Sequence, residues 1–165
     1  MPAKPLVDLS QFDFASPRFT LKDIQEVNPQ RHEFAQLTAV VHVDEKEQIA
    51  VGYKDITGDE FWVPGHMPGY PLMPGVIQCE CAAQLGGFYA QTFNVVDGDY
   101  VGFGGMKDVR FRQPILPDCR LDLVCQIQQI RARKLVYFKF QGFVGEQMAF
   151  EGNMTGVSIT SMPSG

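Results

Sequence analysis

Residues 61–93 read FWVPGHMPGYPLMPGVIQCECAAQLGGFYAQTF. Prolines and glycines recur through residues 61–75, which excludes regular structure there and predicts a long shaped loop. From Val76 to about Phe93 the only helix breakers are two adjacent glycines, and apolar residues lie on nearly every face. Such a pattern is typical of a helix that a sheet surrounds. The stretch therefore predicts a loop followed by one long central helix.

The segments on either side of this stretch read as β-strands. Residues 39–43 and 49–53 are short β-branched runs separated by an acidic turn, which predicts a hairpin. After residue 99, four strand-like segments are joined by short turns, and we expect each to pair with the next in an antiparallel meander. These segments lie around residues 100–112, 121–131, 134–144 and 147–160.

The proline-rich residues 1–30 read as an extended arm on the surface, with one helical turn around residues 21–27. The remainder, residues 31–165, has a length typical of a single domain. We therefore expect an α+β fold, in which an antiparallel sheet wraps around one long central helix and an N-terminal arm precedes it.

The composition excludes several classes of protein. In a chain of 165 residues, 45% are hydrophobic and 20% charged, which is ordinary for a globular domain and unlike a disordered or fibrous protein. The formal net charge of -5 argues against a chain-wide basic surface for nucleic acid. The four cysteines suggest no disulfide framework, and no secretory signal or transmembrane run is visible. We expect a cytoplasmic protein without a membrane span.

Two titratable side chains stand out in the loop and the helix. Between residues 61 and 96, Glu80 is the only formally charged residue, and His66 is the only other group that titrates near neutrality. A carboxylate in an apolar helix is costly to bury, so its pKa rises and the group tends to stay protonated. Gln84 follows one helical turn later and can hold the carboxyl by a hydrogen bond. The pair predicts an acid and a base in an apolar pocket.

Plainer interpretations exist for each residue taken alone. A histidine in such a loop often holds backbone carbonyls, and a glutamate in a helix is usually exposed. The exposed interpretation is weaker at Glu80 because Cys79 and Cys81 beside it are of a type that is mostly buried. The two cysteines point about 200° apart on a helix and cannot chelate one ion. We therefore expect no metal and no cofactor.

One string of residues resembles a known family signature. It is GHMPGYPLMPGV at residues 65–76, followed by Glu80 and Gln84. This string is similar to the motif of the 3-hydroxyacyl-(acyl carrier protein) dehydratases of the FabZ type, which are hot-dog-fold enzymes of fatty acid synthesis. VRFRQPILP at residues 109–117 and, more weakly, NPQRHEF at residues 28–34 resemble further segments of that family. The resemblance spans about residues 22–160.

This resemblance implies a site and a reaction. It implies that His66 removes the C2 proton of a 3-hydroxyacyl thioester and that Glu80 protonates the departing 3-hydroxyl, which leaves a trans-2-enoyl thioester. Backbone N–H groups at the start of the helix suit the developing enolate, and Gly75 is the residue expected under the thioester oxygen. Gln84 is expected to support Glu80.

The resemblance also implies partners. Family members are homodimers in which the histidine of one chain faces the acidic residue of the other, often assembled further into hexamers. We therefore expect a homodimer with shared active sites, and a trimer of dimers as the larger assembly. The substrate is expected on acyl carrier protein or coenzyme A. Candidates for a basic rim that meets an acidic carrier are Lys107, Arg110, Arg112, Arg131, Arg133 and Lys134.

Two other functions stay open at this point. A hot-dog acyl thioesterase also places an acidic residue near the central helix, but the Gly-His-Met-Pro-Gly loop at residues 65–69 argues against it. A non-catalytic acyl-binding hot-dog protein would keep the apolar tunnel and lose the His66 and Glu80 pair. Because both residues are present, an enzyme is the preferred interpretation.

Overall fold

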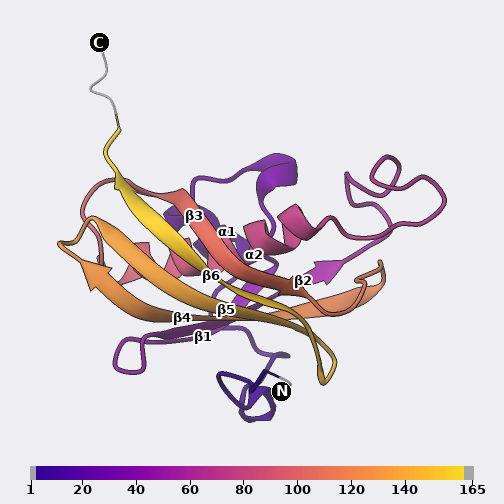
Figure 1. The fold of residues 1–165 in the computed structure, drawn as a ribbon, viewed down its shortest axis with the longest axis horizontal. Helices are drawn as coiled ribbons and strands as arrows, with labels where there is room; N and C mark the ends of the chain where they lie inside the picture. The colour runs from indigo at the N-terminus through magenta and orange to yellow at the C-terminus, as the bar shows by residue number, and fades with distance from the viewer. Residues whose placement is uncertain (1–2, 162–165) are drawn as a thin grey trace.

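A computed structural model describes residues 3–161 of the chain. Within this range one antiparallel sheet curves around a long central helix, as the sequence predicted (Figure 1). The helices are α1 (Leu21–Val27) and α2 (Gly75–Thr92), with short 3₁₀ turns at Leu9–Gln11 and His32–Phe34. The strands are β1 (Ala39–Asp44), β2 (Ile49–Ile56), β3 (Tyr100–Phe111), β4 (Cys119–Arg131), β5 (Leu135–Val144) and β6 (Gln147–Ile159).

The strand order of the sheet is β1-β2-β4-β5-β6-β3. The predicted meander is confirmed for β4, β5 and β6, but it is wrong for β3, which pairs with β6 and not with β4. Residues 112–118 between β3 and β4 include Pro114 and Pro117, so no tight hairpin can form there. The chain instead crosses to place β4 beside β2. As a result β3 lies at the edge of the sheet, and one of its sides pairs with no strand among residues 3–161.

The central helix α2 is held in place by tight packing against the concave face of the sheet. Leu85 and Phe88 are buried, and Gly86 lies so close to Cys125 on β4 that an added Cβ would sit 3.1 Å from its Sγ. On β2, a Cβ at Gly52 would lie 2.8 Å from a backbone oxygen of β1. Close packing of this kind fixes the position of each residue on the helix. The helix therefore forms a rigid frame for Glu80.

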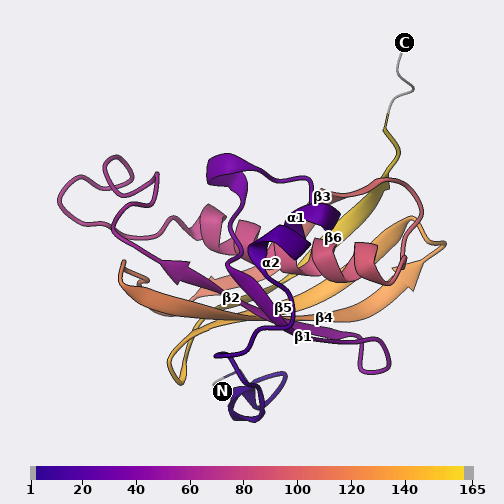
Figure 2. The same ribbon diagram turned by 180° about the vertical axis from the view of Figure 1, so that it is seen from behind.

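The N-terminal arm is held against the sheet by apolar contacts and hydrogen bonds. Apolar residues between Leu6 and Phe14 pack against the outer face of the sheet, opposite α2, whereas α1 lies beside α2 on the other face (Figure 2). The arm is tied by the fully buried Gln141, whose Oε1 accepts from the Leu6 N–H at 2.8 Å and whose Nε2 donates to the Lys4 carbonyl at 3.0 Å. Apolar residues of the arm cover Ile49, Val51, Val124 and Phe143.

Candidate active site

Glu80 lies half-buried on the second turn of α2, between the buried Cys79 and Cys81. Desolvation by burial raises the pKa of its carboxyl above the usual range, and a hydrogen bond from Gln84 lowers the pKa by a smaller amount. The Gln84 Nε2 donates to the Glu80 Oε1 at 2.8 Å, which confirms the predicted contact. Glu80 is thus a carboxyl group inclined to keep its proton.

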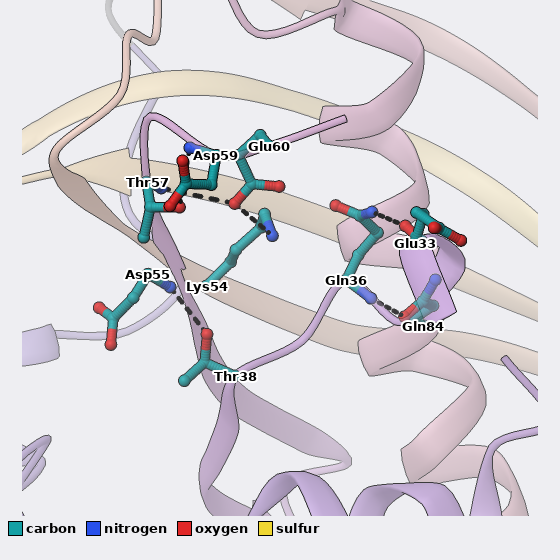
Figure 3. Close-up of polar contacts among 9 residues, drawn as sticks. All are labelled: Glu33, Gln36, Thr38, Lys54, Asp55, Thr57, Asp59, Glu60 and Gln84. Carbon is teal, nitrogen blue, oxygen red and sulfur yellow. Dashed lines mark hydrogen bonds and ion pairs between the residues drawn. The ribbon is translucent and has the colours of Figure 1, made fainter. Parts of the chain in front are cut away.

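The orientation of the Gln84 amide follows from its other contacts. Its Oε1 accepts from the backbone N–H of Gln36 at 2.9 Å, a group that can only donate (Figure 3). The Nε2 must therefore face the other way, where it donates to the Phe34 carbonyl at 2.6 Å as well as to Glu80. Because Gln84 donates to one carboxyl oxygen of Glu80, the other oxygen is the one that carries the proton when the carboxyl is protonated. Gln36 was missed from the sequence, where it reads as an ordinary polar residue between strands.

His66 lies on the exposed loop between β2 and α2. Its Nδ1 is 2.6 Å from the carbonyl oxygen of Leu72, which can only accept, so Nδ1 carries a hydrogen. The Nε2 of the neutral ring is then the unprotonated nitrogen, available as a base. The His66 backbone N–H donates to the Trp62 carbonyl at 2.9 Å, and the buried Trp62 side chain anchors this part of the loop.

A buried ion pair secures the base of the loop that carries His66. Lys54 on β2 lies with its Nζ 3.0 Å from the Glu60 Oε1, and both side chains are almost fully enclosed (Figure 3). The pair packs near Cys81, whose thiol pKa is raised to about 12, mainly by burial. Sequence reasoning missed the pair because a lysine in a strand and a glutamate in a loop both read as surface residues. No local pattern signals that they meet.

Gly75 is the first residue of α2, and it lines the same pocket as His66. In the described chain the N–H groups of Gly75 and Val76 donate to no acceptor, as expected at a helix N-terminus. An added Cβ at Gly75 would lie 2.7 Å from the ring of Phe111. Close approach of the β3 edge therefore accounts for the glycine, while the free N–H groups suit an anionic oxygen.

The two candidate catalytic residues line different pockets of this chain. One pocket holds His66 and Gly75 beside Phe111, at the end of β3. The other holds Glu80 and Gln84, together with residues 100–103 at the start of β3. Among the pockets found in residues 3–161, none is lined by both His66 and Glu80. The two pockets lie at opposite ends of the edge strand β3.

The six basic candidates fall into paired and unpaired groups. Arg112 pairs with Glu151, and Arg133 pairs with Asp97 at 2.7 Å. The other four are exposed and form no ion pair within residues 3–161, and two of them line one surface depression with residues of β3 to β6. The unpaired residues are Lys107, Arg110, Arg131 and Lys134, of which Lys107 and Arg131 line the depression.

Two further searches concern metal sites and membrane spans. In residues 3–161, no three His, Cys, Asp or Glu side chains gather in a way that would hold a metal ion. Over the same range, neither helix has the length and apolar character needed to cross a membrane.

Structural comparison shows which proteins share the fold. The dehydratase heterocomplex ApeI:P from Xenorhabdus doucetiae superposes with a TM-score of 0.71 at 15% identity, covering 84% of this chain and 91% of that chain. The PaaI protein of the phenylacetic acid degradation operon from E. coli superposes with a TM-score of 0.55 at 13% identity, covering 72% and 80%. At these identities the likeness concerns the fold alone.

Sequence comparison identifies the family. A 3-hydroxyacyl-(acyl-carrier-protein) dehydratase FabZ from Moorella thermoacetica is 36% identical over 131 residues, covering 79% of this chain and 90% of the relative. A FabZ from Clostridium botulinum is 35% identical over 112 residues, covering 67% and 79%. The family model of the FabA-like domain matches residues 28–153, which include His66, Gly75, Glu80 and Gln84. The chain therefore belongs to the FabA-like family, together with these FabZ dehydratases.

Proposed function

We propose that this protein dehydrates 3-hydroxyacyl thioesters of acyl carrier protein to trans-2-enoyl thioesters in fatty acid biosynthesis. His66 Nε2 takes the C2 proton, and the protonated oxygen of Glu80 delivers a proton to the 3-hydroxyl as the C3–O bond breaks. A C2=C3 double bond forms and water leaves, so no oxidant or reductant is needed. One observation supports this proposal most strongly. The chain has a base, His66, whose free nitrogen is fixed by the contact with Leu72, and an acid, Glu80, whose pKa is raised by burial.

The developing enolate needs stabilisation that is in place before the reaction. The free N–H groups of Gly75 and Val76 lie at the positive end of the α2 dipole, beside His66. Oriented donors of this kind act on the thioester oxygen without reorganising, which is where they contribute most to the rate. In this proposal Gln84 positions the Glu80 carboxyl and does not contact the substrate.

The separation of the two pockets supports a dimer in which each active site is shared. β3 is an unpaired edge, and it carries exposed apolar side chains, including Phe103 at 54% and Phe111 at 53% exposure. The unpaired N–H and C=O groups of such an edge strand can pair with a strand of a second chain. Antiparallel pairing of two β3 strands about a twofold axis sets the start of one strand opposite the end of the other. Glu80 of one protomer is thereby brought towards His66 of its partner.

The carrier protein is the preferred form of the substrate. Lys107, Arg110, Arg131 and Lys134 leave basic groups unpaired on a chain whose net charge is -5, so the positive charge is local and not general. A local basic surface suits docking of an acidic carrier. We further propose a cytoplasmic location, which the four free thiols support.

The test is a comparison of 3-hydroxyacyl groups carried on acyl carrier protein and on coenzyme A, with enoyl and free thiol followed separately. Enoyl formation without thiol release is the expected result, and carrier substrates should react faster. Release of free thiol and 3-hydroxy acid would instead identify a thioesterase. Binding without any turnover would identify an acyl-binding protein, and either outcome would overturn the proposal.

A further inference from the structure

The groove beside Glu80 extends far along α2. Its lining includes Glu80, Ala83, Gly87 and Gln91, which recur on one face of the helix. Glu80 and Gln91 are therefore on the same side, at about 16 Å from one another along the helix axis. Ala83 and Gly87 between them have little or no side chain and leave room over the helix. The groove follows this face of the helix away from Glu80, where the reacting end of an acyl chain would lie.

Part of the groove lining is apolar. The sheet and the edge strand contribute Val101, Phe103, Phe138 and Met154, beside the polar Thr155. Methylene groups of an acyl chain gain free energy by leaving water for such a surface. These apolar side chains therefore suit the binding of a hydrocarbon chain.

The far end of the groove is polar, which a plain hydrocarbon chain does not require. Gln91 lies there on the helix, and Gln30 and Tyr100 line the same groove. In the described residues neither glutamine side chain forms a hydrogen bond, and Gln30 Oε1 and Gln91 Nε2 are enclosed without a partner. Gln84, nearer the reacting end, has both its amide atoms bonded. Enclosed amide groups without partners are costly and uncommon, so their presence at one end of a binding groove points to a polar ligand group.

The charges of the residues that line the groove limit which polar group the ligand can carry. No lysine or arginine lines the groove, and its one ionisable carboxyl is Glu80 at the other end. A carboxylate at the tip of the acyl chain would therefore be desolvated without a counter-charge. A hydroxyl group both donates and accepts, and so matches an amide oxygen, an amide N–H and a phenol.

Building on the proposed function, we propose that the preferred substrate is a 3-hydroxyacyl thioester with a second hydroxyl group at the end of the chain remote from the thioester. Gln30, Gln91 and Tyr100 recognise that hydroxyl and set the specificity, whereas His66 and Glu80 carry out the reaction. The alternative occupant of the polar end is the partner protomer, since Tyr100 also lies on the β3 edge.

The test compares pairs of 3-hydroxyacyl thioesters of acyl carrier protein of equal chain length, with and without a terminal hydroxyl, over a series of lengths. Wild-type protein is measured beside Gln91→Leu, Tyr100→Phe and the exposed control Gln147→Leu. At the best length we expect wild type to prefer the hydroxylated chain in kcat/KM by about tenfold or more, as two neutral hydrogen bonds would give. Gln91→Leu should remove that preference and speed turnover of the plain chain, and Gln147→Leu should leave it unchanged.

The outcomes separate this inference from the function on which it rests. If wild type dehydrates neither member of any pair, the proposed function fails. If it dehydrates both members equally at every length, or if the preference survives in both Gln91→Leu and Tyr100→Phe, the specificity inference alone is overturned. Loss of the dimer in Gln91→Leu, seen by light scattering with the substrate preference unchanged, would assign the amides to the protomer contact and also overturn it.

Discussion

At the scale of single residues, the site is defined by the direction of its hydrogen bonds. The Leu72 carbonyl fixes which nitrogen of His66 is free, and the Gln36 N–H fixes which end of Gln84 faces Glu80. Backbone groups, whose roles as donor or acceptor cannot change, thus determine the orientation of the Gln84 amide and which ring nitrogen of His66 is free.

Replacing either candidate should abolish most of the activity and preserve the fold. His66→Ala removes the base, and Glu80→Gln keeps the shape of the side chain but cannot deliver an acidic proton. We expect dehydration to fall by about 10² to 10⁴ fold in each variant. Enoyl formation measures the rate, and circular dichroism checks the fold. Near-normal turnover in either variant would remove that residue from the mechanism.

The pH profile should report the hydrogen bond between Gln84 and Glu80. Burial raises the Glu80 pKa, so the protonated acid persists above the usual glutamate range, and activity should fall as pH rises through that raised value. Because the Gln84 contact lowers the pKa, Gln84→Leu should shift the falling limb to higher pH. Its maximal rate should drop less than that of Glu80→Gln. A limb that stays in place or moves to lower pH would contradict the assignment of Glu80 as the acid.

Asp122 on β4 is an ionisable group outside the site that should affect stability. Its pKa is raised to about 6, mainly by desolvation, and its Oδ1 is enclosed without a partner. The pKa of Asp122 is higher in the folded than in the unfolded protein. Wild type therefore loses stability as pH climbs from about 3.8 to about 6, whereas an asparagine at this position does not ionise. The free energy of unfolding of Asp122→Asn, relative to wild type, should therefore increase over that range. Urea titrations at pH 3.5 and 7.5 test this, and a constant difference would refute it.

At the scale of elements, local pattern predicted the structure well where contacts are local. The bounds of α2 differ from the prediction by one residue at each end, and Gln84 meets Glu80 because both lie on one helix face. The pairing of β3 with β6 was not predictable from adjacent strands, because it depends on a long crossover. The contact of Lys54 with Glu60 was also missed, since both residue types are usually exposed. Sequence patterns carry periodicity but little information on distant partners.

The N-terminal arm should detach from the sheet as a unit when the hydrogen bonds of Gln141 are removed. Gln141 bonds both Lys4 and Leu6, so Gln141→Leu removes two hydrogen bonds between the arm and β5. We expect amide exchange in residues 3–14 to speed up by about tenfold or more, because local opening needs less free energy. Exchange in α2 should stay as in wild type, as should exchange throughout Gln128→Leu, which alters an exposed residue on β4. Equal acceleration in α2 would indicate global destabilisation and not release of the arm.

At the scale of the whole molecule, the position of β3 links the architecture to catalysis. The crossover that takes β3 to the sheet edge leaves its outer side free for a second copy. The same strand borders the His66 pocket at its end and the Glu80 pocket at its start. One topological feature therefore underlies both the proposed protomer contact and the proposed division of the site between protomers.

Subunit mixing tests that division directly. His66→Ala and Glu80→Gln homodimers each lack one member of every site. In a shared-site heterodimer one site combines both substitutions and the other combines both native residues. Free exchange of equal amounts makes about half of the dimers heterodimers, so the mixture should recover about one quarter of the wild-type activity. A mixture of His66→Ala with the double variant should recover none. Heterodimers verified by mass spectrometry that stay inactive would show that each protomer must supply both residues of its own site.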